Sequence, residues 1–176
     1  MLLNGDSYRA EVCIFSHLLE KERDDMKTEN KEFLAATHKK FATLKELVEQ
    51  VGMNEAWEKM LVGFPEQQKK RMTPFLAAPT LFEGFTRSIP FFESVGMEME
   101  VVDISNDDCD AVLEIQKYCP YLEICNEYGF ETPCHVICEM DVEATHRAFP
   151  EMRAEILSRQ AFDSCVCIFK YERPMK

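Results

Sequence analysis

Apolar side chains recur every three or four positions through the first half of the chain, a spacing typical of helices. A first predicted helix follows Asp6 or Ser7, either of which can cap it, and reaches about Met26. A second helix begins at Thr28, and Gly52 stands where a glycine often ends a helix. The seam of this second helix lasts under about three heptads, so it predicts packing within the domain rather than a coiled coil.

Prolines divide the next segment, where shorter helices are predicted at residues 54–63, at 66–72 and between Pro74 and Pro90. From Val95 onward the pattern changes to alternation. The segment GMEMEVVDIS is a predicted strand, and SNDD is a turn cluster that joins it to a second strand in a hairpin. Alternation in the second strand puts four side chains on one face, as in a half-buried antiparallel strand: Cys109, Ala111, Leu113 and Ile115.

Two helices and two strands follow. CPYLEICNEYGF is a predicted short helix that tolerates Pro120 in its first turn and ends at Gly129. Thr132 is the expected cap of the next helix, with Pro133 in its first position, and this helix reaches about Phe149. MRAEILSRQ and SCVCIFKYER are the last two predicted strands.

These elements predict one α+β domain over residues 1–176. Its helical N-terminal half (1–92) packs on a small antiparallel sheet, and the second half (93–176) inserts two helices between two strand pairs. A chain of 176 residues that is 46% hydrophobic can bury a substantial core. No apolar run approaches the roughly 18 residues of a membrane span, and the N-terminus has no secretory signal, so we expect a cytoplasmic protein.

The net charge of −12 argues against two classes of partner. Nucleic acids and anionic membrane surfaces both repel a chain this acidic, so neither is expected. An anionic small molecule is still compatible with this charge, provided that a local base attracts it. The outer edge of the sheet and the N-terminal helices are both candidate surfaces for a homodimer.

The eight cysteines are the least random feature of the composition. In a cytosolic chain they argue against a disulfide framework. The stretch ETPCHVICEMD, read as a helix, puts Cys134, Cys138 and Asp141 on one face. His135 and Glu139 form a second pair one turn apart. The stretch is therefore a metal site, a catalytic thiol site or the buried face of a helix.

The spacing favours a thiol site over a metal site. The chain has no C-x-x-C pair, so we predict no cofactor and no metal, although four thiols that converged in space would bind one. Cys119 lies at a strand-to-helix junction, where the positive end of a helix favours a thiolate. Asp141 or His135 on the following helix is the candidate general acid or base.

The C-terminal half, residues 95–172, resembles the L-2-amino-thiazoline-4-carboxylic acid hydrolase family. The shared pattern is a Cys-Pro after a strand, a helix ending near a glycine, a cysteine shortly before an aspartate, and a final Cys-x-Phe strand. In this chain it is Cys119-Pro120, Gly129, Cys138 with Asp141, and Cys167-Ile168-Phe169. The order of elements is also similar to that of the 4-vinyl reductase ligand-binding domains and the TRAPP transport-subunit fold.

The resemblance implies hydrolysis of a C–N bond in a cyclic amidine, in which water opens a 2-aminothiazoline ring and leaves a carbamoylated cysteine. Cys119 or Cys138 would provide the nucleophile, and Asp141 or His135 the acid. The remaining expected substrate-binding residues are Cys134, Cys167 and Tyr121. A cation for the substrate carboxylate would come from Arg147, Arg153 or Arg159.

The alternative function is a binding module without turnover, of the 4-vinyl reductase type, that holds a small ligand or a metal. A third possibility is an assembly protein that dimerises through its helical half. The acid on the thiol face favours the first two functions over the third, because an aspartate is rarely buried without a partner.

Overall fold

The computed structural model describes residues 31–130 and 135–175. Four helices come first: α2 (Lys31–Val51), α3 (Met53–Leu61), α4 (Phe64–Leu76) and α5 (Leu81–Ser94). They are followed by β1 (Met99–Asp103), β2 (Cys109–Gln116), α6 (Tyr121–Tyr128), α7 (Cys138–Ala148), β3 (Arg153–Ser158), the short 3₁₀ helix η2 (Gln160–Phe162) and β4 (Cys167–Pro174). This order confirms the predicted α+β class. The helix predicted between Asp6 and Met26 lies outside the described residues.

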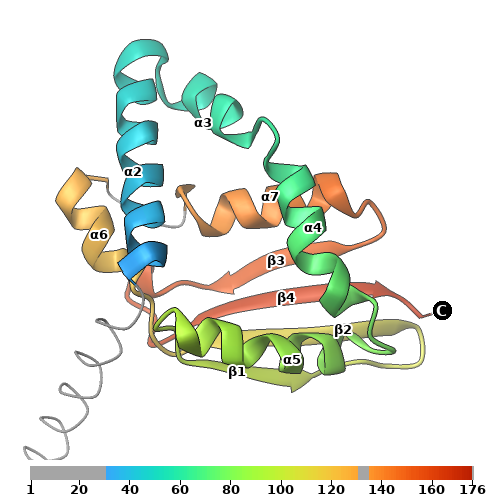
Figure 1. Ribbon diagram of the computed structural model, residues 1–176. Coiled ribbons are helices and arrows are strands. Elements are labelled where there is room, and N and C mark those ends of the chain that lie inside the picture. Colours follow the sequence, from blue (N-terminus) through green and yellow to red (C-terminus); the bar gives the residue numbers. More distant parts are fainter. Residues whose placement is uncertain (1–30, 131–134, 176) are drawn as a thin grey trace, which may run out of the picture.

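The four strands form one antiparallel sheet in the order β1-β2-β4-β3. β1 and β2 are the predicted hairpin, and β4, the last strand in the chain, lies between β2 and β3. One face of the sheet carries the helices: α5 packs on β1 and β2, and α7 packs on β3. Helix α4 contacts both α5 and α7 and so spans the space between them (Figure 1).

The alternation along β2 is present, but its more deeply buried face is the one that carries polar residues. Asp110, Val112, Glu114 and Gln116 are all buried. On the other face Ala111 is buried, but Cys109, Leu113 and Ile115 are only partly covered. The face that carries the four residues grouped by alternation is therefore the less deeply buried one. The reason is tertiary, because α5 covers the side of β2 on which the acids and the amide lie.

A buried ion pair accounts for the first of these acids. Arg173 on β4 donates from Nε to Asp110 Oδ2 at 2.7 Å, and its other nitrogens donate to backbone carbonyls of the segment between α4 and α5. Asp110 also accepts from the backbone N–H of Leu81 at 2.9 Å. The pair therefore fixes the start of α5 to the two central strands.

Helix α7 begins later than the sequence predicted. Residues 135–137 form turns, and the helix starts at Cys138, so the described part of the predicted helix at 132–149 is correct only from Cys138 onward. A tertiary contact accompanies this change, because Trp57 Nε1 donates to the carbonyl oxygen of His135 at 3.0 Å. Cys138 is consequently in the first turn of the helix rather than its middle.

Two of the prolines that were predicted to divide the helices lie inside helices instead. Pro74 and Pro90 both lie inside helices, in α4 and α5, and the break between them falls before Thr80. The Thr80 side chain accepts from the backbone N–H of Glu83 at 3.1 Å and caps α5. Farther along, α6 follows Pro120 and ends at Gly129, which has φ of 72°, as predicted.

Candidate functional site

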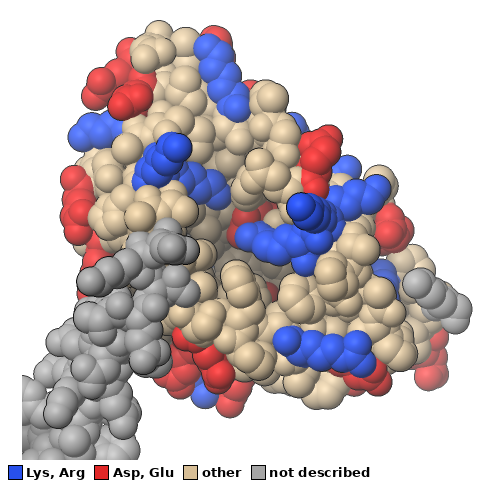
Figure 2. Space-filling model, viewed as in Figure 1, with Lys and Arg blue, Asp and Glu red and all other residues tan. Residues whose placement is uncertain are grey.

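A cavity of about 90 Å³ lies between the inner face of the sheet and helices α4, α5 and α7. Most of its lining residues are apolar or aromatic, and the aromatic members are Phe33, Phe75, Phe85, Phe91, Phe92, Tyr121, Phe169 and Tyr171. In Figure 2 this face of the molecule is hollowed between the helices, with Lys and Arg side chains along the rim and acidic side chains deeper inside. Such a lining suits a small, flat, largely apolar molecule that carries a few polar groups.

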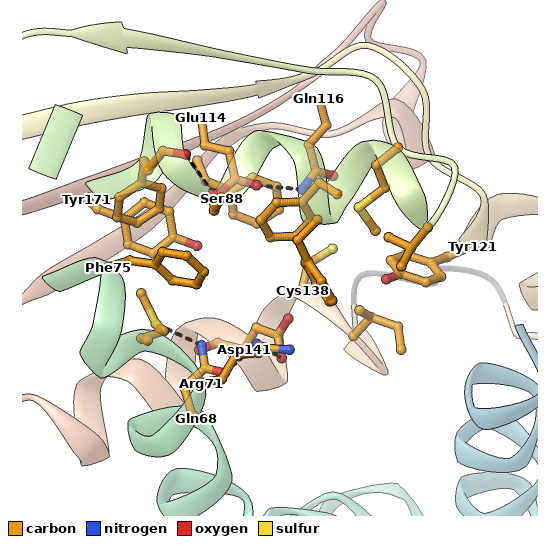
Figure 3. Close-up of a pocket in the computed structure, with 18 of the residues that line it drawn as sticks. Gln68, Arg71, Phe75, Ser88, Glu114, Gln116, Tyr121, Cys138, Asp141 and Tyr171 are labelled. Carbon is orange, nitrogen blue, oxygen red and sulfur yellow. Dashed lines mark hydrogen bonds and ion pairs between the residues drawn. The ribbon is translucent and has the colours of Figure 1, made fainter. Parts of the chain in front are cut away.

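The polar residues of the cavity fall into two groups at opposite ends (Figure 3). Glu114 and Gln116 project from β2 at the sheet end. Arg71 from α4 and Asp141 from α7 lie at the helix end, with Arg71 Nη2 at 3.3 Å from Asp141 Oδ1. Gln68 holds this second group in place, because it accepts from Arg71 and donates to Thr145 Oγ1 at 3.0 Å.

Glu114 is the most perturbed acid of the site. Its carboxyl is only 4% exposed, and burial raises its pKa from 4.5 to about 7. A hydrogen bond of 2.7 Å from Gln116 Nε2 to Glu114 Oε1 opposes part of that rise. At neutral pH the carboxyl is thus close to half protonated, so it can serve as a proton donor or a proton acceptor.

Cys138 lies between the two polar groups and lines the same cavity (Figure 3). It is the first residue of α7, where backbone N–H groups without helical partners favour negative charge. Asp141, three residues later, lies on the same side of the helix. The predicted pairing of a thiol and an acid in one hollow is therefore present in the geometry for Cys138 and Asp141, and Tyr121 is part of the wall.

Two cations lie near Asp141, and of these Arg71 lines the cavity whereas Lys40 does not. Arg71 is the first, and Lys40 of α2 is the second, half-buried with its Nζ 4.3 Å above the ring of Phe64. Burial lowers the pKa of Lys40, whereas the charge of Asp141 opposes that shift. Neither cation was singled out from the sequence, because Arg71 ends a Lys-Lys-Arg run that is typical of a solvated helix surface.

The three arginines proposed from the sequence lie elsewhere. Arg147 pairs with Glu143 at 2.7 Å, Arg153 is 80% exposed, and Arg159 pairs with Glu139 at 3.1 Å. None of the three lines the aromatic cavity.

Cys119 and Cys167 form a separate thiol pair that does not line the cavity. Both are buried, at the ends of β2 and β4 that adjoin each other in the sheet. A hydrogen bond from Cys119, together with the backbone N–H of Gln160 at 3.3 Å and the charge of Arg159, lowers the pKa of Cys167 to about 6. Cys119, one of the two predicted nucleophiles, is therefore not among the residues that line the cavity of Cys138.

His135 lies in a different groove. Its Nδ1 pairs with Glu139, and the groove is bordered by Trp57, His146 and Arg159 rather than by Asp141. Cys134, the remaining predicted substrate-binding residue, lies outside the described residues. Cys138, Asp141 and Tyr121 thus line one cavity, whereas His135, Cys119 and Cys167 are not among its lining residues.

Within residues 31–130 and 135–175, no group of three or more His, Cys, Asp and Glu side chains is placed to hold a metal ion. None of the helices in the described part of the chain is both long and apolar enough to cross a bilayer.

Comparison with known proteins places these features in a family. No curated protein matches the chain significantly. A solved structure with a similar fold is the phenol-responsive sensory domain of the transcription activator PoxR with phenol, at a TM-score of 0.54 and 11% identity, covering 78% of this chain and 74% of that one. A family model described as L-2-amino-thiazoline-4-carboxylic acid hydrolase matches residues 17–171. Because this match spans most of its length, the chain belongs to the L-2-amino-thiazoline-4-carboxylic acid hydrolase family.

Proposed function

We propose that the chain is a hydrolase that opens the C–N bond of a small cyclic amidine bearing a carboxylate, and that the aromatic cavity is its active site. One observation carries this proposal: a thiol, a carboxylate and a cation, those of Cys138, Asp141 and Arg71, line the same cavity. Family membership supports the reaction class, because the family is named after such a hydrolase.

The two ends of the cavity suit the two ends of such a substrate. A carboxylate at the mouth would pair with Arg71 and Lys40. The flat ring would lie between the aromatic walls, with the amidine carbon close to Cys138. The Cys138 proton would pass to the amidine, and Asp141 would stabilise the cation that results.

The covalent steps then need a second proton donor, for the ring nitrogen that departs. The Cys138 sulfur bonds to the amidine carbon, the ring C–N bond breaks, and the departing nitrogen takes a proton from Glu114. Water next attacks the same carbon and gives one proton to the Glu114 carboxylate. The C–S bond to Cys138 then breaks with its electron pair on the sulfur, and the remaining hydroxyl proton passes to that sulfur as the product carbonyl forms. The net result is addition of one water molecule, with the enzyme regenerated and a carbamoyl group left on the product.

A binding domain without turnover is the second candidate. The mainly apolar lining favours it, since only a minority of the cavity residues are polar. The fold that the chain shares with a sensory domain is compatible with this candidate as well. In that case Arg71 and Glu114 would orient a ligand, and Cys138 would be a wall residue.

Incubation with L-2-amino-thiazoline-4-carboxylate, followed by mass spectrometry of the product, tests the proposal. We expect turnover by the wild-type chain and a loss of at least about 100-fold in Cys138→Ala. Cys165→Ser is the matched control, because Cys165 is exposed and outside the cavity, and its rate should stay within about twofold of the wild type. Saturable binding without turnover would support the second candidate, and the absence of both would contradict both.

A further inference from the structure

The sheet end of the cavity holds a polar atom that the fold leaves without a partner. Gln116 is 6% exposed, and its Oε1 has no hydrogen-bond partner among the described residues. Its other amide atom, Nε2, donates to Glu114 Oε1 at 2.7 Å, which fixes the orientation of the side chain. Buried acceptors without partners are rare in folded proteins, so this atom is a candidate for pairing with a ligand.

Glu114 adds a second polar group beside that acceptor. Its carboxyl lines the same cavity and, like Gln116, comes from the buried face of β2 (Figure 3). The two residues are two positions apart on the strand, so their side chains point to the same side of the sheet. The sheet end therefore offers these two hydrogen-bonding groups in a cavity whose lining is otherwise mostly apolar.

We propose that Glu114 and Gln116 form a subsite for a hydrogen-bond donor of the ligand, an amino or hydroxyl group on a flat ring, which donates to Gln116 Oε1. This inference rests on the proposed function in one respect, because it takes the aromatic cavity as the place where the ligand binds. It adds the direction of binding: the donor group enters first and reaches the sheet, while an anionic group stays at Arg71. A ring that lacks the donor leaves Gln116 Oε1 unpaired and is rejected.

The opposite character of the two ends supports this direction. The helix end holds Arg71, and the half-buried Lys40 interacts electrostatically with Asp141 beside it, so this end attracts an anion. The sheet end lacks any such cation among its lining residues and instead has the carboxyl of Glu114, which would repel an anion whenever it is ionised. A molecule with a donor at one end and a carboxylate at the other thus has one favourable orientation.

The test compares two ligands that differ only in the donor group. Dissociation constants of L-2-amino-thiazoline-4-carboxylate and of the thiazoline-4-carboxylate without the amino group are measured by calorimetry in the full chain carrying Cys138→Ser, which prevents consumption of the ligand. We expect the amino compound to bind about ten to a hundred times more tightly, the range expected when a buried acceptor loses its partner. Equal affinities would overturn the subsite while leaving the proposed function intact.

A variant assigns the preference to Gln116. Gln116→Met keeps a side chain of similar size but removes the acceptor, so we expect the preference for the amino compound to fall to within about threefold, with the affinity of the other compound retained. A preference that survives this substitution would overturn the assignment. Should the variant fail to fold, the comparison of the two ligands on the unsubstituted subsite still decides whether a donor is recognised.

The experiments also distinguish a failure of the proposed function from a failure of the subsite. If the chain neither turns over nor binds either thiazoline, the proposed function is wrong, and phenol and toluene at equal concentrations replace the thiazolines in thermal unfolding of the wild-type chain. Greater stabilisation by phenol, which carries a donor, would support the subsite. Equal stabilisation, or none by either compound, would overturn it.

Discussion

At the scale of single residues, the chemistry of this site depends on burial as much as on residue type. The chain has 32 acidic residues, but Glu114 differs from most of them because α5 and the aromatic walls exclude water from its carboxyl. Desolvation disfavours the charged form, and this is the main reason why its pKa rises to about 7. The same acid on an exposed strand would be fully ionised at neutral pH and could not donate a proton.

Glu114→Gln should stabilise the chain at high pH and leave it unchanged at low pH. Below pH 4.5 the carboxyl is protonated in the folded and the unfolded chain; between 4.5 and about 7 only the folded chain keeps the proton. Stability of the wild type therefore falls as pH rises through this window, by up to about 3 kcal/mol. The variant has no proton to lose, so at pH 8 it should exceed the wild type by about 2–3 kcal/mol in urea unfolding.

The matched control for this experiment is Glu155→Gln, which changes an exposed acid on β3. Its stability difference from the wild type should stay within about 0.5 kcal/mol and vary little with pH. An equal change in stability for the two variants at pH 8 would contradict a pKa of about 7, because Glu114 would then be ionised in the folded chain at little cost.

At the scale of elements, the cavity depends on how closely α4 and α5 approach each other. Gly84 of α5 packs on the end of α4, and a Cβ added there would lie 2.2 Å from the carbonyl oxygen of Phe75. This contact is with backbone and cannot be relieved by rotation of a side chain. Since Phe75 lines the cavity, the spacing of the two helices also determines the width of the site.

Gly84→Ala should therefore destabilise the chain, by about 1–3 kcal/mol, because it forces the two helices apart. Helix propensity alone predicts the opposite sign, a gain of about 1 kcal/mol for alanine over glycine. Thermal and urea unfolding of the variant distinguish the two expectations. Thr86→Ala, at an exposed position of the same helix, is the control and should change stability by less than about 0.5 kcal/mol. Stabilisation by Gly84→Ala would mean that the close approach is absent in solution.

At the scale of the whole molecule, a chain with a net charge of −12 has to attract an anion locally. Arg71 of α4 and Lys40 of α2 both interact with a single acid, Asp141, and together they would provide that local attraction. The site is assembled from the sheet and several helices, so a ligand that binds it stabilises the folded chain as a unit.

A carboxylate ligand should therefore raise the melting temperature more than its methyl ester does, and Arg71 should account for the difference. At a concentration about 100 times the dissociation constant, the stabilisation is about 2.7 kcal/mol. Arg71→Ala should weaken binding of the carboxylate by about tenfold or more and leave binding of the ester nearly unchanged. Arg87→Ala, which removes an exposed cation of α5, is the control. A loss that is equal for the two ligands would assign Arg71 a structural role only.

Local signals in the sequence were sufficient for much of the fold. The hairpin of β1 and β2, the start of α6 after Pro120 and its end at Gly129 follow from turn residues, proline geometry and a glycine with positive φ. These features depend on a few neighbouring residues, and hence they can be predicted without knowledge of the rest of the chain. The choice of Cys138, Asp141 and Tyr121 for the same site also followed from their spacing and from the family resemblance, and their roles stay predictions.

Only the tertiary structure decided which of the reactive residues share a cavity. Cys119 lies beside Cys167, because β4 returns to pair with β2, and His135 lies in another groove, because α7 begins only at Cys138. Burial of Glu114 and Gln116 depends on α5, which covers β2 from about 20 residues earlier in the chain. Local conformation and composition are enough to predict most of the elements and the kinds of reactive groups, because both depend on neighbouring residues. Packing between distant elements determined the protonation and the partners of those groups, because desolvation and contact depend on what lies nearby in space.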